Sequence, residues 1–282
     1  MTPLSISIVI PVSFDRRLAQ CLASIDEPVE VVIVLNNHPT PEVAAIAASD
    51  TRARIIRVPG SGCNLARVFN LGIEAATHDR VLLMNSDCIF PPGFIRRMAG
   101  LLEQSDIAKA RVRFAHHTYR QKLVASCRTL FHHRFESGGN LFGPGLAFHK
   151  RIRSALGGYF FNEAMGWGED GELSKRINNA HLPFVVSGEF IEHAPEGMLH
   201  DLRTALYIGR GRRRLHISKN ISAHQTMVRD VADMLGDRRG HCREALALGG
   251  GPLCAYYVAW RIATYVGYYT FFSRRNRSWD KI

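Results

Sequence analysis

Short apolar runs and amphipathic segments alternate along the first third of the chain. Four runs rich in β-branched residues are typical of buried strands: residues 5–12, 29–35, 54–58 and 80–84. The segments between them carry apolar residues at helical spacing: residues 16–25, 41–49 and 64–76. Strands and helices that alternate in this way predict βαβ units and a mainly parallel sheet with helices on both faces.

The pattern is less regular after the fourth strand. It predicts a helix over 94–104, a strand over 108–114, a glycine-rich strand over 143–149 and a short helix over 151–156. Residues 115–140 are rich in His and Arg and have weak periodicity, so they are expected to form an insertion or loop near a site rather than core.

Composition and charge narrow the class of protein. The chain has 282 residues, of which 46% are hydrophobic, which is enough for a sizeable core, and a net charge of +11. Residues 201–282 hold 15 Lys or Arg against 6 Asp or Glu, so most of the excess lies in the last third. This distribution favours an anionic surface or a phosphate-bearing ligand, and the absence of zinc-finger or basic-aromatic RNA motifs argues against a nucleic-acid partner.

The cysteines and the N-terminus indicate in which cellular compartment the protein is expected to lie. The six cysteines are scattered, without a CxxC pair, which is typical of reduced thiols in a cytoplasmic protein. The first residues lack a basic region and a cleavage site, so they are expected to begin the first strand rather than a signal peptide.

The tripeptide Asn85-Ser86-Asp87 directly follows the fourth apolar run, where parallel sheets bind ligands. A carboxylate with a second oxygen ligand two residues earlier can share one hard cation, such as Mg²⁺ or Mn²⁺. Asn, Ser and Asp are also favoured turn residues, and these three residues alone favour a turn.

The segment Gly166-Trp167-Gly168-Glu169-Asp170 places two acids at the start of a predicted helix. Acids in a first helical turn are commonly structural, because they cap the helix and complement its dipole. A general base, however, needs a carboxylate held beside an acceptor hydroxyl, and Trp167 offers a platform on which a sugar ring can stack. His193, taken alone, is expected to be a structural histidine unless the fold brings it to a metal.

Three segments together resemble the family 2 glycosyltransferases, which have the GT-A fold. They are SISIVIPV, GCNLARVFNLGIEAATHDRVLLMNSDCIFPPGF and GPGLAFHKRIRSALGGYFFNEAMGWGEDGELSKRI, and the resemblance spans roughly residues 5–200. It implies a Rossmann-like sheet divided into a nucleotide-sugar-binding half, residues 1–105, and an acceptor-binding half, residues 106–200. Residues 201–282 would form a basic, mainly helical C-terminal region.

The resemblance also implies roles for individual residues. Asp87 would bind Mn²⁺ or Mg²⁺, with Asn85 at the first position of the DxD motif and His193 as a further ligand. Asp170 would be the catalytic base with Glu169 beside it, and His200 would be a substitute for His193. The substrate contacts expected from the resemblance and from the residues are Pro11, Val12, Asn36, Asn64, Arg67, Asn85, Ser86, Trp167, Arg210 and Arg212.

The chain departs from the family pattern at two positions. Leu35-Asn36-Asn37 replaces the usual aspartate that contacts the nucleotide base, so Asn36 would make that contact through its amide. Asn85 replaces the first acid of DxD, which leaves coordination to Asp87, the diphosphate and His193.

The implied activity is an inverting, single-displacement transfer of a sugar from a nucleoside-diphosphate sugar to an acceptor hydroxyl. The acceptor would be a saccharide or a lipid-linked molecule in the synthesis of a polysaccharide, a glycolipid or a cell-envelope glycan. Two alternatives stay open: a non-catalytic GT-A protein that binds carbohydrate or nucleotide, and a sugar nucleotidyltransferase. The second would need a glycine-rich phosphate loop after the first strand, where residues 11–15 read PVSFD.

Two features of the C-terminal region have competing interpretations. Residues 207–214, YIGRGRRR, form either a solvated charge run or a mobile loop whose Arg210 and Arg212 close on a phosphate. Residues 253–272 are apolar and aromatic, and they predict a helix at the inner face of the cell membrane or one packed on the core or a second subunit. A homo-oligomer is therefore left open.

Overall fold

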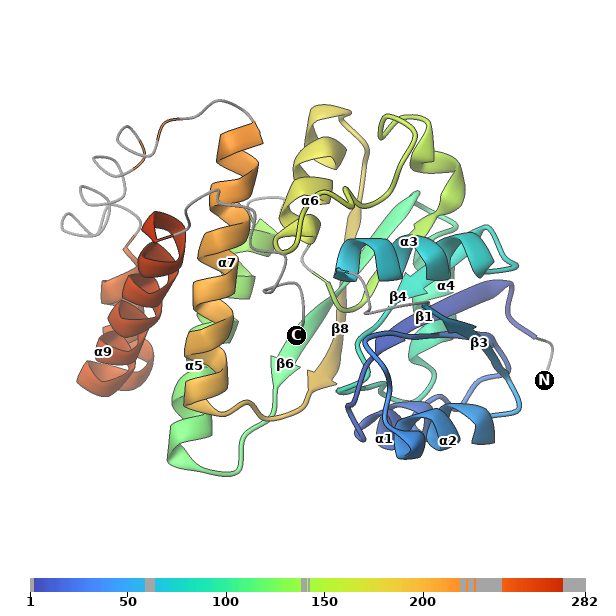
Figure 1. Cartoon of the computed structure of the whole chain (residues 1–282), viewed down its shortest axis with the longest axis horizontal. Helices are drawn as coiled ribbons and strands as arrows, with labels where there is room; N and C mark the ends of the chain where they lie inside the picture. The colour runs from blue at the N-terminus through green and yellow to red at the C-terminus, as the bar shows by residue number, and fades with distance from the viewer. Residues whose placement is uncertain are drawn as a thin grey trace. The chain divides into compact units, whose positions relative to one another are not determined.

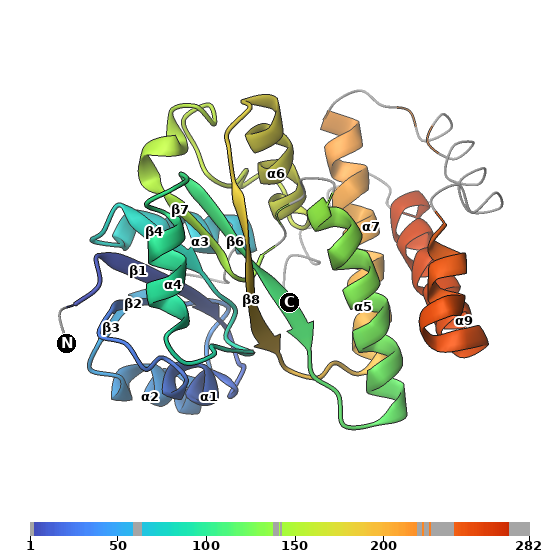
Figure 2. The same cartoon turned by 180° about the vertical axis from the view of Figure 1, so that it is seen from behind.

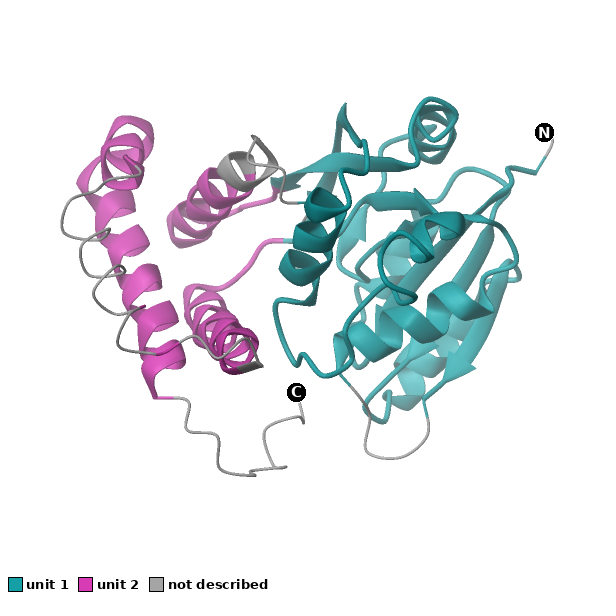
Figure 3. Cartoon of the chain, turned by 90° about the horizontal axis from the view of Figure 1, so that it is seen from above, with its two compact units in different colours: residues 1–113, 135–194, 277–282 teal, residues 114–134, 195–276 magenta. Residues whose placement is uncertain are grey.

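The structure, a computed structural model, describes residues 3–58, 64–137, 141, 143–218, 222, 226 and 240–270. The chain divides into two compact units (Figure 3). The first contains residues 1–113, 135–194 and 277–282, and the second contains residues 114–134 and 195–276. Cys63 and residues 271–282, which include Phe271 and Phe272, lie outside the described part of the chain.

The described residues of the first unit form one eight-stranded sheet in the order β3-β2-β1-β4-β7-β6-β8-β5. Its first four strands pair in parallel, and the residues of β1, β2 and β4 are almost all buried, because helices cover both faces. Their bounds are Ile6–Val12 for β1, Glu30–Leu35 for β2, Ala53–Arg57 for β3 and Arg80–Leu83 for β4. The predicted βαβ half is confirmed.

The other half of the sheet contains antiparallel pairs, which makes the sheet mixed. Strand β7 pairs antiparallel with both β4 and β6, and the short β5 pairs antiparallel with the end of β8. The bounds are Cys88–Ile89 for β5, Ile107–Phe114 for β6, Leu146–His149 for β7 and Val185–His193 for β8. The β5–β8 pair brings Cys88 opposite His193, 105 positions apart in sequence.

Helices pack on both faces of this sheet. Helices α3 (Leu65–Ala75) and α6 (Glu169–Asn179) share one apolar core with the strands. Figures 1 and 2 show α1 (Leu18–Ala23) and α2 (Pro41–Ser49) across the sheet from α3. Strand β5 is followed by α4 (Phe94–Leu101), and β7 is followed by the 3₁₀ helix η1 (Lys150–Arg153).

The loop expected over residues 115–140 is wrong, because Tyr119–Ser137 form a helix, α5. Val124, Cys127 and Leu130 recur every three residues, and their side chains are buried. The His and Arg residues between them dilute the apolar pattern, which explains the weak signal in the sequence. These buried side chains belong to the core of the second unit.

The second unit is built from α5, α7 (Met198–Ser218) and α9 (His241–Tyr269). Helix α9 bends at Gly249 and Gly250, whose backbone dihedrals are not helical. Leu253, Tyr256 and Trp260 are buried in one cluster with α5 and α7. The aromatic face predicted from the sequence is therefore packed within the second unit.

The second unit contains a buried carboxylate, that of Asp201, whose oxygens are hydrogen-bonded. Asp201, fully buried, accepts hydrogen bonds from the Arg128 guanidinium and from the Tyr256 hydroxyl, the latter at 2.6 Å. This arrangement links all three helices, since each contributes one residue. Among the described helices, none has both the length and the apolar character needed to cross a membrane.

Glycines allow α7 and α9 to cross closely, so we expect Gly267→Ala to destabilise the second unit. A Cβ at Gly267 would lie 2.0 Å from the backbone oxygen of Leu206, and backbone cannot move aside as a side chain can. The expected loss is at least the ~1–3 kcal/mol typical of overpacking, measured by denaturant unfolding. Gly251→Ala in the same helix is the control, because a Cβ there meets no atom within 4 Å. Equal unfolding of the two variants would contradict the close crossing.

Candidate active site

The tripeptide Asn85-Ser86-Asp87 lies at the carboxyl end of β4, as the sequence predicts. The backbone N–H of Met84 continues the pairing by donating to Val9, and the chain then turns, with the Cys88 N–H donating to the carbonyl of Asn85 at 3.3 Å. The segment is thus both a turn and the end of a parallel strand. That turn leaves the Asp87 carboxylate partly exposed at the edge of the sheet.

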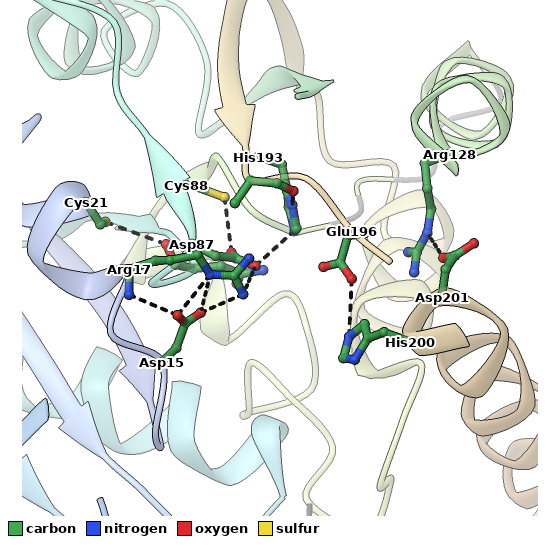
Figure 4. A network of polar contacts seen from close by, with 12 residues as sticks. Asp15, Arg17, Cys21, Asp87, Cys88, Arg128, His193, Glu196, His200 and Asp201 are labelled. Carbon is green, nitrogen blue, oxygen red and sulfur yellow. Dashed lines mark hydrogen bonds and ion pairs between the residues drawn. The ribbon is translucent and has the colours of Figure 1, made fainter. Parts of the chain in front are cut away.

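His193 lies beside Asp87, although 105 residues separate it from Cys88, its partner in the sheet. Its Nε2 is 3.4 Å from Oδ2 of Asp87 (Figure 4). Its Nδ1 is 2.9 Å from the carbonyl oxygen of Ala194, which can only accept, so Nδ1 carries the hydrogen. The other ring nitrogen, Nε2, therefore faces the carboxylate.

This arrangement fits a divalent cation. A carboxylate oxygen and an imidazole nitrogen are both ligands of divalent cations, and here the two atoms face each other 3.4 Å apart. Within the described residues, the group that can hold a metal comprises Asp87, Cys88 and His193, whose ligand atoms all lie within 4.8 Å of one another. His200 is outside it: its side chain is 70% exposed and lies 3.3 Å from Glu196.

Arg17 is a site residue that the sequence did not reveal. Its guanidinium binds the Asp15 carboxylate, with Nε 2.9 Å from Oδ1 and Nη2 2.9 Å from Oδ2. Nη2 also lies 3.5 Å from Oδ2 of Asp87 (Figure 4). The only signal was a charged pair just after β1, and exposed pairs of this kind are common. A fixed positive charge therefore lies next to the candidate metal ligand.

The residues expected to form the nucleotide pocket lie at the adjoining ends of β1 and β2. Pro11 pairs with Val34 and Val12 with Leu35, and the Asn36 N–H donates to the carbonyl of Val12 at 2.9 Å. The side chain of Asn36 is buried beside this junction. The two residues that follow have positive φ, 51° for Asn37 and 52° for His38, which turns the chain sharply.

Asn64 is the N-cap of α3, and both ends of its amide contact the protein. Its Oδ1 accepts from the Arg67 N–H at 3.0 Å, and its Nδ2 donates to the carbonyl of Glu163 at 2.6 Å. The side chain therefore closes the helix and connects it to the loop before α6. The Arg67 side chain is exposed, and the substrate contacts expected of both residues stay predictions.

Glu169 and Asp170 open α6, as predicted. Gly168, with φ of 81°, ends the preceding loop, and the N–H of Gly171 donates to Oδ1 of Asp170 at 2.7 Å. Glu169 is buried with 6% of its surface exposed, Asp170 is partly exposed, and Trp167 is exposed just before them. One acid is thus enclosed, while the other is partly exposed.

The two acids differ in how their charges are supported. Burial, together with the charge of Asp170, raises the pKa of Glu169 to about 8. Burial also raises the pKa of Asp170, but the N–H groups of Gly171 and Gly143 and the charge of Lys109 oppose this rise. Asp170 is therefore the acid that ionises first, and Glu169 keeps its proton near neutral pH.

The raised pKa of Glu169 makes stability depend on pH. A carboxyl whose pKa is raised by folding contributes stability at low pH, and that contribution is lost as pH rises from about 4.5 to about 8. Glu169→Gln cannot ionise, so its unfolding free energy relative to wild type should rise across this window by a few kcal/mol, at about 1.4 kcal/mol per pKa unit. Denaturant unfolding at pH 5 and pH 8.5 measures it, and a difference that does not change with pH would contradict it.

Lys109, on β6, is a second residue that the sequence did not reveal. Its side chain is fully buried, and its Nζ donates to the carbonyls of Ala110 and, at 3.2 Å, Pro144. This holds the segment that carries Gly143, whose N–H supports Asp170. Both the charge and the hydrogen bonds of Lys109 therefore favour the ionised form of Asp170.

We expect Lys109→Met to shift the pH dependence of activity. Without the buried charge the pKa of Asp170 rises further, so the acid limb of the kcat/KM profile should move to higher pH. Lys150→Met is the control, because Lys150 binds the carbonyl of Ala76 instead. A variant with lower activity but an unshifted acid limb would show that Lys109 is structural only.

A comparison with known protein families identifies the family of this chain. The model of glycosyl transferase family 2 matches residues 7–155, more than half of the chain. The chain belongs to glycosyltransferase family 2. It is therefore a glycosyltransferase that uses a nucleotide-sugar donor, and the match contains β1–β4 and the Asn85-Ser86-Asp87 turn. The match ends before Glu169, Asp170 and His193, so their roles do not follow from it.

Solved structures confirm the GT-A class of this glycosyltransferase. S. aureus TarS, residues 1–349, crystallised in complex with UDP-GlcNAc, superposes with a TM-score of 0.53. The identity is 14%, and the alignment covers 94% of this chain and 91% of that one. At this identity the likeness shows the fold alone. No curated protein sequence matches the chain.

The prediction of a mobile loop at residues 207–214 is wrong, because these residues lie within helix α7. The Arg210 guanidinium lies 5.4 Å from the ring centre of Tyr207, and that of Arg212 lies 5.3 Å from the ring centre of Tyr268. Helical backbone with stacked guanidiniums cannot close as a loop does. Contact of either arginine with a phosphate stays a prediction.

Proposed function

We propose that this glycosyltransferase inverts the anomeric centre in a single displacement, with Asp170 as the general base and a divalent cation at Asp87 and His193. The observation that carries the proposal is the pair Glu169 and Asp170 at the start of α6, in which one acid is enclosed and the other is partly exposed. A base must be ionised at working pH and accessible to the acceptor. Two observations support Asp170 in this role: it is partly exposed, and the N–H groups of Gly171 and Gly143 and the charge of Lys109 favour its ionised form.

Asp170 would act on the acceptor hydroxyl. As the hydroxyl oxygen attacks the anomeric carbon, its proton passes to a carboxylate oxygen of Asp170, and the bond between that carbon and the diphosphate oxygen breaks. The Gly171 N–H holds the carboxylate at the helix N-terminus, which stabilises negative charge before the reaction. Protonated Glu169 avoids a second buried charge beside the base.

The metal site supports the leaving group. Asp87 and His193 would hold the cation, and Asn85 would offer an amide oxygen; such a cation, when bound, neutralises charge on a departing nucleoside diphosphate. Mn²⁺ and Mg²⁺ are the cations expected from the sequence. Arg17, 3.5 Å from Asp87, adds a fixed positive charge where the diphosphate would lie.

The donor would lie across the ends of β1 and β2. Pro11, Val12 and Asn36 would contact the nucleoside, Ser86 the phosphate end, and Trp167 the acceptor sugar. The complex of TarS with UDP-GlcNAc makes uridine sugars the first donors to test. The acceptor would be a saccharide or a lipid-linked saccharide, and the free cysteines among the described residues favour a cytoplasmic site of synthesis.

A donor screen tests the proposal. Thermal unfolding is measured with each nucleotide sugar in the presence of Mn²⁺, Mg²⁺, Co²⁺ or Zn²⁺, and again with EDTA. We expect one base and sugar to raise the midpoint only with a cation, and slow hydrolysis of that donor to follow. Binding without hydrolysis or transfer to any acceptor would instead support a non-catalytic GT-A protein.

A further inference from the structure

We propose that Cys88 is a third protein ligand of the metal site and that the site therefore prefers a borderline cation such as Zn²⁺ or Co²⁺ to Mg²⁺. The inference deepens the proposed function, because it names the kind of cation that serves the same site. It rests on three side chains from two strands that are far apart in sequence.

The position of the Cys88 sulfur is set by the sheet. Cys88 pairs with His193, and Ile89 with Glu192, in the short antiparallel ladder of β5 and β8. Sγ of Cys88 lies 3.6 Å from Oδ1 of Asp87, whose other carboxylate oxygen lies 3.4 Å from the His193 imidazole. Sulfur, oxygen and nitrogen thus converge within 4.8 Å of one another (Figure 4).

A single residue, Ala194, holds two of these ligands in place. Its carbonyl accepts from Nδ1 of His193 at 2.9 Å, and its N–H donates to the backbone oxygen of Asp87, also at 2.9 Å. A backbone carbonyl on the far nitrogen of a ligating histidine fixes the tautomer and the orientation of the ring. Backbone hydrogen bonds therefore hold two of the ligands in place, as is common in the metal sites of proteins.

The donor set favours a borderline cation. Mg²⁺ prefers an all-oxygen shell, whereas a thiolate, an imidazole and a carboxylate are all ligands of Zn²⁺, and three such ligands leave a position open for a phosphate oxygen. Asn85, in place of an acid, removes one of the anionic oxygens that a hard cation would need. As a thiolate ligand, Cys88 would supply the negative charge that Asn85 lacks, and it would do so through sulfur, a softer ligand atom than oxygen.

Coordination would release one proton. In the metal-free protein, the Cys88 thiol donates its hydrogen toward Oδ1 of Asp87 at 3.6 Å. A bound cation replaces that hydrogen on sulfur, and the proton leaves to water. The metal-free and metal-bound sites then differ in what lies between sulfur and carboxylate: a hydrogen in one and the cation in the other.

Absorption spectroscopy of the full chain with Co²⁺ tests the inference. A thiolate bound to Co²⁺ gives a charge-transfer band in the near ultraviolet, and oxygen or nitrogen ligands do not. We expect wild type to show the band and Cys88→Ser to lose it. Zn²⁺ affinity of that variant should fall by at least the roughly 10–100-fold that loss of an outer-shell partner costs. Cys21→Ser is the control, because Cys21 is also buried near the turn but donates to the carbonyl of Asn85.

Wild type that binds Co²⁺ without the band would overturn the inference, whatever the fold of the variants. A band that survives in Cys88→Ser, or that Cys21→Ser removes, would overturn it too. The outcome is independent of catalysis. A thiolate band in a protein that transfers no sugar would support this inference and contradict the proposed function. Sugar transfer by a protein that shows no band would support the proposed function and contradict this inference.

Discussion

Asp170→Asn is expected to abolish sugar transfer while donor binding stays nearly unchanged. Asparagine keeps the shape of the side chain and its contact with the Gly171 N–H, but it cannot accept the acceptor proton. Loss of a positioned general base costs ~10²–10⁴ in kcat. Initial rates with a saturating donor measure the loss, and calorimetry of the nucleoside diphosphate measures binding.

Asp106→Asn is the matched control for this substitution. Asp106 is in the same unit and binds the Arg151 guanidinium at its surface, so the same chemical change there should leave kcat unaltered. Turnover of the Asp170 variant within a few-fold of wild type would show that another group removes the proton. Equal loss of donor binding and of kcat would show instead that Asp170 supports the donor site.

Asp87→Ala is expected to remove the cation-dependent part of donor binding. Asp87 is the ionised ligand of the candidate metal site, whereas His193 supplies one neutral nitrogen, so His193→Ala should weaken binding less. Calorimetry of the nucleoside diphosphate with and without the divalent cation measures both variants. The effect should appear as a change in cation dependence, because the contacts to the nucleoside lie elsewhere, at the ends of β1 and β2.

Asp15→Ala is the control that distinguishes loss of the metal ligand Asp87 from a disturbance of the residues around it. Asp15 binds Arg17, which lies beside Asp87, but Asp15 is outside the group whose atoms can hold a metal. The control should therefore retain cation-dependent binding. Unchanged affinity in Asp87→Ala would return Asn85-Ser86-Asp87 to a simple turn.

The parts of the site predicted from sequence are those that local pattern determines. The apolar run of β4 ends where Asn85, Ser86 and Asp87 begin, and the carboxyl ends of parallel strands bind ligands, so the position of this turn followed from the pattern. Glu169 and Asp170 at the start of a helix also followed, because Gly168 interrupts the preceding segment and apolar spacing resumes after it.

The parts that were missed depend on long-range pairing or on exceptions to residue preference. Strand β5 has two residues, too few for any periodic signal, yet it is the strand that brings Cys88 to His193. Lys109 lies in β6 two residues before Arg111, at a position where alternation predicts an exposed side chain, yet it is fully buried. Arg17 could be recognised as a site residue only from the structure, in which Asp87, just after β4, lies beside its guanidinium.

The aromatic segment of the C-terminal region shows what amphipathicity alone leaves open. The pattern correctly predicted which side of α9 is apolar, since Leu253, Tyr256 and Trp260 share a buried face. It could not predict the partner of that face. The partners are α5, hidden in the sequence by its His and Arg residues, and α7, whose Gly209 permits a close crossing.

The anomeric configuration of the first product tests the central claim most directly. With a donor whose sugar is α-linked to the diphosphate, proton NMR of the product at early times, before mutarotation, reports the configuration through the anomeric coupling. A single displacement by an acceptor that Asp170 deprotonates predicts the β product. An α product would contradict the account, because a single displacement from the face opposite the diphosphate inverts the anomeric centre.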